Sequence, residues 1–540
     1  MDNRNKRRWV VITGGVISGL GKGIVSASIG KLLTAQMKVI PIKCDGYLNV
    51  DPGTINPIEH GEVFVLDSGS EVDMDFGHYE RFMGITCQPS WNLTMGSIFK
   101  TIIDKERRGD YLGKTVQMVP HVTDEILNRF YAIAEEEKAD IVIIEIGGTI
   151  GDIENQLYLE AVRQLKFHVG PEHCIFVHLT LVPRLSVVGE QKSKPTQQSV
   201  SVLRELGIQP DIIIGRSDSM LDEHTKEKIA LFTNVSRDAV ISNPDLDSVY
   251  ELPLIFEREG LSRLMQTRLR IYSPPDLHLW EKLVSTAQHA EKSARIAICG
   301  KYTALRDSYV SVVEALTHAG ANLNARIRIT WIESTDIENG NVKLDEVLKD
   351  IDGVLVPGGF GNRGIEGKIE IIRYAREHGI PFLGICLGMQ CAVLEFSRNV
   401  LGLKGAHSTE FNGKTKHPVI DLLPEQKRIK NKGATMRLGA CRAVLRKGSI
   451  VRSLYGNREE AFERHRHRYE VNPAYHQALE SGGMILSGLS ENGRLAEFIE
   501  IPKHPFFVAT QAHSELKSSL IKPSPLYFGF VQAALRRGEK

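Results

Sequence analysis

Short apolar runs alternate with longer amphipathic stretches along the first half of the chain. Each run is rich in Val and Ile, and each is followed by a stretch with apolar residues at helical spacing. Continuous apolar runs of this kind are typical of strands that are buried on both faces of a parallel sheet. The pattern predicts a doubly wound α/β sheet with strands at Val10–Thr13, Val39–Lys43, Ile141–Ile146, Cys174–Val182, Ile212–Ile214 and Val240–Ser242.

A second series of apolar runs begins near residue 295. It predicts strands at Arg295–Cys299, Ile327–Trp331, Gly353–Val356, Phe382–Cys386 and Phe506–Thr510. Between the two series, Pro274-Pro275 precedes a charged, helical-looking run, which is typical of an interdomain linker. A length of 540 residues also exceeds what one hydrophobic core usually serves. We therefore predict two doubly wound α/β domains, residues 1–272 and 294–540, joined by a linker at residues 273–293.

Composition narrows the class of protein. The chain is 42% hydrophobic and 25% charged with a formal net charge of +1, so a charged ligand must be held locally. The apolar runs are far shorter than the roughly 20 residues of a membrane helix. Seven scattered cysteines without a C-x-x-C pair indicate neither a disulfide framework nor a structural zinc site. We expect a cytoplasmic protein with no nucleic-acid or membrane partner.

A glycine-rich segment joins the first predicted strand to a helical run. It reads Gly14-Gly-Val-Ile-Ser-Gly-Leu-Gly-Lys-Gly23. In such a loop, backbone N–H groups close on phosphate at the helix N-terminus and a lysine adds positive charge. The spacing is one residue longer than a Walker A loop, and Gly23 replaces the Ser or Thr that would hold magnesium. The segment predicts a P-loop-like nucleotide site with Lys22 on the phosphates, against the alternative of a tight turn with a surface lysine.

Without that hydroxyl, magnesium must be held by carboxylates from elsewhere in the chain. Asp73 and Asp75 lie in one polar segment, and Glu145 ends an apolar strand before Gly147-Gly148. A carboxylate at the carboxyl end of a parallel strand faces the crevice where such sheets bind ligands. A solvated or capping role is the alternative for the two aspartates, whereas an acid inside an apolar strand needs a partner.

The second domain has a cysteine at a sharp turn. In Phe382-Leu-Gly-Ile-Cys-Leu-Gly-Met-Gln390, Cys386 lies between a strand and a helix and is surrounded by small residues. This arrangement is a nucleophile elbow with sulfur in place of oxygen. The glycine-rich segment Val356–Gly361 follows another strand and could supply N–H groups to an oxyanion. We predict that Cys386 is a catalytic nucleophile rather than a buried structural thiol.

A base for this thiol comes from the segment after the last predicted strand. His513 and Glu515 stand two residues apart, so both side chains share one face if the backbone stays extended. The imidazole would activate the thiol and the carboxylate would fix its tautomer. Alone, a His-x-Glu pair is more often a surface feature, and its combination with the cysteine turn favours a catalytic triad.

The tract Arg464-His-Arg-His-Arg-Tyr469 has two further interpretations. Alternating arginines make metal binding by the histidines improbable, because neighbouring cations oppose a dication. A solvated basic loop and a loop that contacts a ligand are left as equal alternatives.

Together these motifs resemble the CTP synthetase family, in which an amidoligase domain is joined to a class I glutamine amidotransferase domain. The resemblance covers the whole chain and also includes Asn49–Thr54, His60–Val65, Gly77–Phe82, Lys105–Gly113, Ile144–Thr149, Lys192–Gln197 and Arg464–Val471, all in order. It implies a carbon–nitrogen ligase that uses ATP and glutamine to convert UTP to CTP through a 4-phosphorylated intermediate.

The resemblance implies a role for each matching residue of the first domain. The ATP-binding residues would be Ser18, Gly19, Leu20, Gly21, Lys22, Gly23, Lys43, Asp75, Arg216, Asp245 and Leu246. UTP, or CTP as inhibitor, would contact Ser18, Asp152, Ile153, Glu154, Lys192, Ser193, Lys194, Pro195, Thr196, Gln197 and Lys228. Magnesium would be held by Asp75 and Glu145.

In the second domain the resemblance implies a complete glutaminase. Cys386, His513 and Glu515 would form the triad, and Gly359 and Leu387 would donate N–H groups to the oxyanion. Glutamine would be held by Gln390, Glu410 and Arg468, and Arg363 lies where the family responds to GTP. A homotetramer, with filaments as a further possibility, is also what the family implies.

Three positions depart from the family pattern: Gly19, the Cys44 to Gly46 segment, and Ala512 with Ser514 around His513. None of them removes a group with a chemical role, although Gly46 in place of proline should loosen the backbone near the ATP loop. Two rival functions are considered, namely an amidoligase that acts on a carboxylate and a nucleotide-gated scaffold with inactive sites. The Lys192–Gln197 segment and Asp152 with Glu154 favour UTP as the acceptor.

Overall fold

The computed structural model of the chain describes residues 7–51, 61–185, 189–301, 306–359, 361–422 and 436–539. Pro52–Thr54, His60 and Phe360, which belong to motifs named above, lie outside the described residues. The chain divides into two compact units. The first comprises Met1–Thr54 and Met74–Glu281, and the second comprises Ile55–Asp73 and Lys282–Lys540. The division near residue 281 falls inside helix α11 (His278–Gln288), within the segment expected to be a linker.

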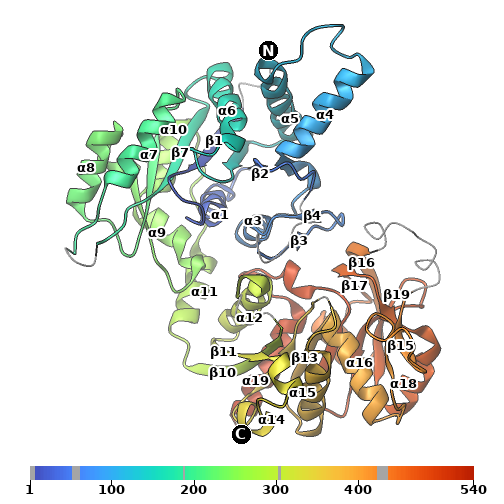
Figure 1. Ribbon diagram of the computed structural model, residues 1–540. Coiled ribbons are helices and arrows are strands. Elements are labelled where there is room, and N and C mark those ends of the chain that lie inside the picture. The colour runs from blue at the N-terminus through green and yellow to red at the C-terminus, as the bar shows by residue number, and fades with distance from the viewer. Residues whose placement is uncertain are drawn as a thin grey trace. The chain divides into compact units, whose positions relative to one another are not determined.

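The first unit is built on a seven-stranded parallel sheet with the order β5-β2-β6-β1-β7-β8-β9. Figure 1 labels β1, β2 and β7 of this sheet. Its strands are β1 (Arg8–Gly14), β2 (Val39–Asp45), β5 (Asn92–Thr94), β6 (Ile141–Ile146), β7 (Cys174–Leu181), β8 (Ile212–Ser217) and β9 (Val240–Pro244). The six apolar runs predicted from the first half are the six long strands of this sheet. Their residues are almost entirely buried, as a sheet covered on both faces requires.

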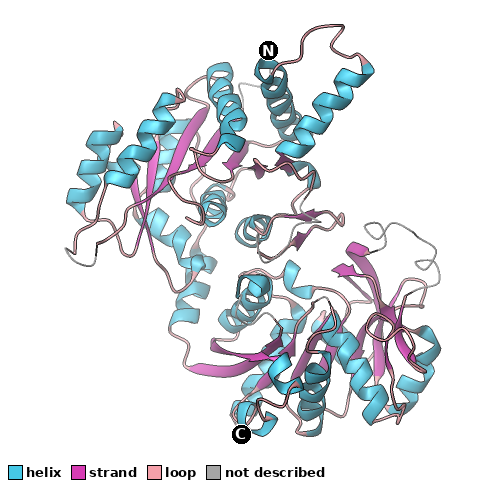
Figure 2. Ribbon diagram, in the orientation of Figure 1, coloured by secondary structure: helices cyan, strands magenta, loops and turns pink. Residues whose placement is uncertain are grey.

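Helices cover both faces of this sheet (Figure 2). On one face α1 packs against α3, α9 and α10, whereas α5 packs against α6, and α7 against α8, on the other. The bounds are α1 (Lys22–Leu33), α3 (Asp75–Met83), α4 (Met95–Arg108), α5 (Thr123–Glu136), α6 (Gln156–Val169), α7 (Lys194–Glu205), α8 (Glu223–Thr233), α9 (Leu252–Arg258) and α10 (Leu261–Leu269). The unit is therefore doubly wound, as predicted.

The second unit contains a nine-stranded sheet with the order β11-β10-β12-β13-β21-β20-β19-β16-β17. The first five strands in this order are parallel and the last four are antiparallel. The bounds are β10 (Lys292–Gly300), β11 (Ala325–Glu333), β12 (Gly353–Val356), β13 (Phe382–Ile385), β16 (Arg437–Leu445), β17 (Glu460–His467), β19 (Ile485–Ser490), β20 (Ala496–Glu500) and β21 (Phe507–Thr510). The five predicted runs form the parallel half.

Two hydrophobic cores lie on the two faces of this sheet. One contains Ile369 and Val393 from α15 and α16, and the other contains Leu316 and Phe530 from α12 and α19. The helices of the unit are α12 (Val310–Asn322), α13 (Ser334–Glu338), α14 (Leu344–Val347), α15 (Ile365–Glu377), α16 (Leu387–Asn399), α17 (Ile450–Leu454), α18 (His476–Gly482) and α19 (Pro525–Gly538). This parallel half positions the strand ends that carry the predicted nucleophile.

Smaller elements complete the second unit. The strands β14 (His407–Ser408), β15 (Pro418–Asp421) and β18 (Glu470–Val471) form a three-stranded sheet, and β3 (Phe64–Val65) pairs with β4 (Glu71–Val72). The loop of the β3–β4 hairpin reaches β16, where the Ala440 N–H donates to the carbonyl of Asp67 at 2.9 Å. In the part of the chain that the structure describes, none of the helices combines the length and the apolar character that crossing a membrane requires.

Candidate functional site

The glycine-rich segment of the first unit forms a loop between β1 and α1. Gly19 and Gly21 have φ angles of 75° and 88°, in the left-handed region that favours glycine. Gly21 is the N-cap of α1, so the loop closes directly onto the helix N-terminus. Lys22 is the first residue of α1, and its Nζ donates to the carbonyl of Gly148 at 2.6 Å. The geometry suits a phosphate held by the loop and by one ammonium group.

Gly23 explains why this loop differs from a Walker A loop. A Cβ atom on Gly23 would lie 1.8 Å from Oδ1 of Asp75, which cannot occur without displacing that carboxylate. The Asp75 carboxylate thus occupies the space that the Ser or Thr side chain of a Walker A loop would enter. A carboxylate supplied by α3 replaces a hydroxyl supplied by the loop.

The carboxylates predicted for magnesium meet at one lysine. Lys43 Nζ donates to Glu145 Oε1 at 2.8 Å and also to Asp75. The other oxygen of Glu145 accepts from Ser26 Oγ at 2.8 Å and from Tyr79 OH at 2.5 Å. Glu145 is fully buried, so it needs these partners. The described residues contain no group of three or more His, Cys, Asp or Glu side chains arranged to hold a metal by themselves.

Burial shifts the pKa values of two charged residues in and beside this cluster, Lys22 and Asp45. Burial is the main reason that the pKa of Lys22 is lowered, and the nearby Lys43 lowers it further. Burial also raises the pKa of Asp45 to about 6, against the opposing charge of Lys43. In both cases burial disfavours the charged form of the side chain. A bound phosphate with its metal ion would bring opposite charges to both groups and so favour their charged forms.

The remaining candidate residues of the first unit follow the carboxyl ends of its strands. Arg216, next to the last residue of β8, pairs with Asp245, after β9, at 2.6 Å, and Leu246 follows Asp245. Asp152 accepts from the N–H and the hydroxyl of Thr149, after β6, at 2.6 and 2.8 Å. Because the carboxyl ends of parallel strands share one edge, the sheet brings these residues and the glycine-rich loop to the same edge.

The segment Lys192–Gln197 leads into α7 and forms its first turn, and two of its side chains make hydrogen bonds within the fold. Ser193 Oγ accepts from Gln197 at 3.0 Å, and Thr196 Oγ1 lies 2.7 Å from Thr180 Oγ1. Lys192 is paired with Glu190 at 2.7 Å. The other residues expected to bind UTP or ATP lie at several places in the first unit. They are Lys194 and Pro195 in the first turn of α7, the exposed Ile153 and Glu154 after β6, the exposed Lys228 on α8, and Ser18 and Leu20 in the glycine-rich loop.

Gly46 has a packing reason that the sequence did not suggest. A Cβ atom there would lie 2.6 Å from Asn155 Oδ1 and 2.7 Å from Glu154 Cβ. The close approach of the Glu154 segment therefore leaves no room for a side chain at this position, and the expectation that glycine loosens the backbone stays a prediction.

Cys386 lies at the predicted elbow of the second unit. It is the N-cap of α16 with φ 52° and ψ −103°, a strained conformation for a residue with a side chain. Gly388 permits the turn, because a Cβ atom on it would lie 2.0 Å from the carbonyl of Val356. The sulfur lies 4.0 Å from the carbonyl of Arg466 and 3.6 Å from Nε2 of Gln511.

The histidine and the glutamate predicted as its partners are in contact. Nδ1 of His513 lies 2.6 Å from Oε1 of Glu515. A Cβ atom on Gly358 would lie 2.7 Å from Cε1 of His513 and 3.5 Å from Cβ of Cys386, so this glycine lets the ring approach the cysteine. Burial opposes a charge on His513, but Glu515 and Cys386 together raise the pKa of His513 well above its ordinary value.

A pocket of about 90 Å³ opens on Cys386. Six of its lining residues were predicted from the sequence, and Met436, His467 and Tyr469 were not. The predicted residues are Gly359, Cys386, Leu387, Gln390, Glu410 and Arg468. Burial raises the pKa of Glu410 while Lys301 and Arg468 oppose that shift. Arg363 is exposed and donates to the carbonyl of Lys301 at 2.6 Å.

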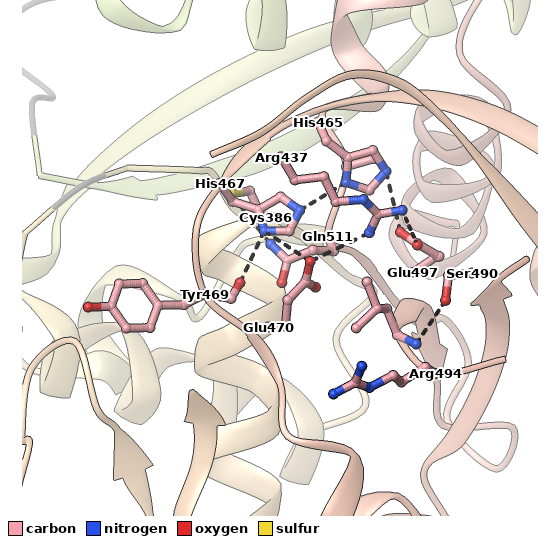
Figure 3. Close-up of polar contacts among 12 residues, drawn as sticks. Cys386, Arg437, His465, His467, Tyr469, Glu470, Ser490, Arg494, Glu497 and Gln511 are labelled. Carbon is pink, nitrogen blue, oxygen red and sulfur yellow. Dashed lines mark hydrogen bonds and ion pairs between the residues drawn. The ribbon is translucent and has the colours of Figure 1, made fainter. Parts of the chain in front are cut away.

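The interpretation of the Arg-His tract as a solvated loop was wrong. Residues Glu460–His467 form β17, and the period of two sends alternate side chains to opposite faces. Arg464 pairs with Asp67 at 2.5 Å and Arg466 with Glu71 at 2.6 Å, both in the β3–β4 hairpin. His465 and His467 are buried on the other face (Figure 3). Strict alternation of arginine and histidine was the signal for a strand.

Two family models match successive parts of the chain. Residues 8–271 match the family model described as CTP synthase N-terminus, and residues 304–533 match glutamine amidotransferase class-I. A solved structure described as the Trypanosoma brucei CTPS glutaminase domain with bound acivicin is 40% identical and has a TM-score of 0.42. It covers 45% of this chain and 94% of that chain.

Two full-length relatives extend the match over both units. The chain is 54% identical over 533 residues to the CTP synthase of Methanopyrus kandleri, covering 98% of this chain and 99% of that protein. It is 52% identical over 530 residues to the CTP synthase of Archaeoglobus fulgidus, covering 98% of both. A match of this identity over nearly the whole length includes both candidate sites, and the chain therefore belongs to the CTP synthase family of glutamine-dependent ligases.

Proposed function

We propose that this chain aminates UTP to CTP in two coupled half-reactions, with one site in each unit. In the first unit, O4 of UTP attacks the γ-phosphorus of ATP and ADP leaves, which gives a 4-phosphorylated pyrimidine. Ammonia then attacks C4, phosphate departs with the former O4, and the nitrogen loses a proton. Phosphorylation is needed because a carbonyl oxygen is a poor leaving group.

The phosphate edge of the first unit is the observation that supports this assignment. Lys22 would neutralise the ATP phosphates, and Arg216, Asp245 and Leu246, at the carboxyl ends of β8 and β9, would contact the same nucleotide. Lys192, Lys194 and Lys228 would hold the second triphosphate, since two polyanions cannot share one edge without cations between them. Asp152, Glu154 and Gln197 would contact the pyrimidine nucleotide.

Asp75 and Glu145 are proposed as the residues that hold Mg²⁺. Their oxygens converge on one ammonium group, Lys43, so the place already gathers hard oxygen donors around a cation. Magnesium bound there with nucleotide oxygens would neutralise charge on the transferred phosphoryl group. Lys43 would then orient the two carboxylates and the phosphate.

In the second unit, Cys386 would attack the side-chain carbonyl of glutamine. The N–H groups of Gly359 and Leu387 would stabilise the oxyanion, and His513 would protonate the departing ammonia. Water then cleaves the thioester and releases glutamate. Glu410, Arg468 and Gln390 line the pocket where the amino acid would bind, with a carboxylate and a guanidinium to match its two charged ends.

Regulation by nucleotides and assembly into oligomers are also part of the proposal. Arg363 is a candidate contact for GTP as activator, because it is an exposed cation bonded to Lys301, which lies beside Gly359. CTP would inhibit by using the triphosphate site of UTP. A homotetramer, and filaments of tetramers, are what membership of the family suggests.

One pair of variants tests whether ammonia production and UTP amination take place at separate sites. Cys386→Ala should abolish CTP formation from glutamine and retain CTP formation from ammonium salts, because the thiol serves only ammonia production. Lys22→Ala should lose both activities, since phosphorylation precedes amination with either nitrogen source. Loss of both activities in a folded Cys386→Ala protein, or ammonia-dependent synthesis by Lys22→Ala, would contradict the proposal. An amidoligase specific for a carboxylate would fail to form CTP from any nitrogen source.

A further inference from the structure

A buried glutamine outside the predicted triad contacts the sulfur of Cys386. Gln511 follows β21, is fully buried, and places its side-chain nitrogen Nε2 3.6 Å from Sγ. Its backbone N–H is also fixed, because it donates to the carbonyl of Glu497 at 2.9 Å. The side chain therefore lies at a defined place beside the reacting atom.

The carbonyl of Tyr469 determines which end of this amide faces the sulfur. A carbonyl oxygen can only accept hydrogen bonds, so Gln390 must present its NH2 group to it, at 3.0 Å. The second hydrogen of that NH2 group reaches Oε1 of Gln511 at 3.2 Å. With its oxygen used in this way, Gln511 must present its own NH2 group to Cys386.

The same carbonyl also fixes a buried chain of histidines (Figure 3). His467 donates from Nδ1 to Tyr469 O at 3.1 Å, and its Nε2 lies 3.0 Å from Nδ1 of His465. Burial lowers the pKa of His467 to about 3, so this ring is neutral and its Nε2 accepts from His465. Tyr469 O is thus held by partners that cannot rotate into solvent.

The chain of histidines ends beside the buried carboxyl group of Glu497. Nε2 of His465 lies 3.3 Å from Oε2 of Glu497, and Arg437 bonds the other oxygen of Glu497 at 2.5 Å. A neutral His465 that donates from Nδ1 has only a lone pair at Nε2, and its contact with Glu497 is not a hydrogen bond, because Oε2 of Glu497 has no hydrogen-bond partner among the described residues. Burial is the main cause that raises the pKa of Glu497 and lowers that of His465. The donors of the hydrogen bonds from His465 to Gln511 are then assigned.

We infer that Gln511 is a further catalytic residue of glutamine hydrolysis, which donates an N–H to the Cys386 thiolate and is oriented for this by Gln390 and the Tyr469 carbonyl. The inference rests on the proposed role of Cys386 as nucleophile. Hydrogen bonding to an anion favours the anion, so Gln511 increases the share of Cys386 present as thiolate. The same donor stabilises the thiolate when it leaves the thioester at the end of the cycle.

The test measures the sulfur itself as well as turnover. In the full-length protein, the rate of alkylation of Cys386 by iodoacetamide is followed against pH, with the modified peptide identified by mass spectrometry. Gln511→Met keeps the length of the side chain and removes the donor. We expect the midpoint of alkylation to rise by about one pH unit and glutamine hydrolysis at pH 7 to fall about tenfold. Ammonia-dependent CTP synthesis and the control Gln477→Met, an exposed glutamine, should be unaffected.

Gln511→Glu keeps the shape of the side chain and replaces the donor by an acceptor. Its midpoint should rise at least as far, and this variant serves if Gln511→Met fails to fold. Slower hydrolysis with an unchanged midpoint in either variant would mean that Gln511 only packs, and would overturn the inference. This outcome differs from failure of the proposed function, which would appear as glutamine hydrolysis by Cys386→Ala.

Discussion

Nδ1 of His513 lies 2.6 Å from Oε1 of Glu515 although the backbone between them is not extended. Glu515 belongs to a 3₁₀ helix, Ser514–Lys517, and His513 is its N-cap. The sequence argument placed both side chains on one face of an extended segment, and that geometry was wrong. The pair forms because the helix turns the carboxylate back toward the ring of its own N-cap residue.

This geometry makes a proline at position 514 acceptable. Ser514 is the first residue of the helix, where proline fits because the helix leaves that N–H without an internal partner. Its hydroxyl is buried and finds no hydrogen-bond partner among the described residues. We expect Ser514→Pro to change glutamine hydrolysis by less than about tenfold, or 1.4 kcal/mol of barrier. Its melting temperature should rise.

Ser514→Ala is the matched control, because it removes the hydroxyl and keeps the N–H. Both variants should hydrolyse glutamine at rates near that of the wild type, measured as glutamate release. A large loss in Ser514→Pro alone would show that the backbone N–H of Ser514 is needed, in conflict with its place in the helix.

The buried carboxyl group of Glu497 gives a second prediction. Glutamine at this position keeps the shape of the side chain, and its oxygen can still accept from Arg437, which contacts Glu497 at 2.5 Å. Because burial raises the pKa of Glu497 and so disfavours its charge, we expect Glu497→Gln to retain the unfolding free energy and glutamine hydrolysis of the wild type. Glu497→Leu should lose about 3–5 kcal/mol of stability, because it removes the acceptor that Arg437 contacts. Strong destabilisation by glutamine would mean that Arg437 needs the charge of an ionised Glu497.

The raised pKa of Glu470 predicts how the unfolding free energy depends on pH. Burial, aided by Glu497 and opposed by Arg437, raises the pKa of Glu470 to about 8 from an ordinary 4.5. The facing groups are Arg437 at 3.5 Å and Nδ1 of His467 at 3.7 Å. The native state binds this proton more tightly than the unfolded chain. The resulting stability is complete below about pH 4.5 and is lost as pH rises to about 8.

Glu470→Gln stays neutral and should lack this loss. Chemical denaturation of both proteins between pH 6 and 9 should give a wild-type stability that falls relative to the variant as pH rises. The exposed pair of Glu480 with Arg446 supplies the control, because Glu480→Gln should give no such trend. A difference that stays constant with pH would contradict a proton held by Glu470.

The sequence predicted most of what depends on local pattern. Apart from the three-residue β5, the parallel strands of both units were found from continuous apolar runs, and the glycine-rich loop and the cysteine elbow from the residues that such turns require. The antiparallel half of the second sheet was missed because β16, β17 and β20 carry charged residues and Ser and Gly interrupt the apolar residues of β19. In β16, Arg437 and Arg442 interrupt the apolar residues, and β17 consists largely of charged residues and histidine.

Long-range partners explain the rest of what was missed. Arg464 and Arg466 are balanced by Asp67 and Glu71, about 400 positions earlier in the chain, and no local pattern reveals such a pairing. The contact of Gln511 with Cys386 could not be predicted from the sequence, because a single glutamine belongs to no pattern that indicates a catalytic role. Its NH2 group faces Cys386 because of contacts with the carbonyl of Tyr469 and the amide of Gln390, which only the structure shows.

Gly23 carries the last prediction. A methyl group on Gly23 would lie 1.8 Å from Oδ1 and 2.4 Å from Cγ of Asp75, so Gly23→Ala must drive that carboxylate away from Lys43. Alanine favours a helix over glycine by about 1 kcal/mol, so α1 itself should not suffer. We expect CTP formation to fall by more than about a hundredfold with glutamine or ammonium as nitrogen source. Basal glutamine hydrolysis should persist, because the Cys386 pocket is built from other residues.

Gly30→Ala is the matched control in the same helix. Its methyl group would meet the side chain of Met83, which is flexible and can shift, so CTP formation should survive with at most a modest loss of stability. Asp75→Ala should be as inactive as Gly23→Ala, and the double variant no worse than either, because both remove the same carboxylate from Lys43. Normal CTP synthesis by Gly23→Ala would mean that Asp75 works from another position. A double variant much worse than both single variants would mean that Gly23 serves the phosphate directly through its backbone.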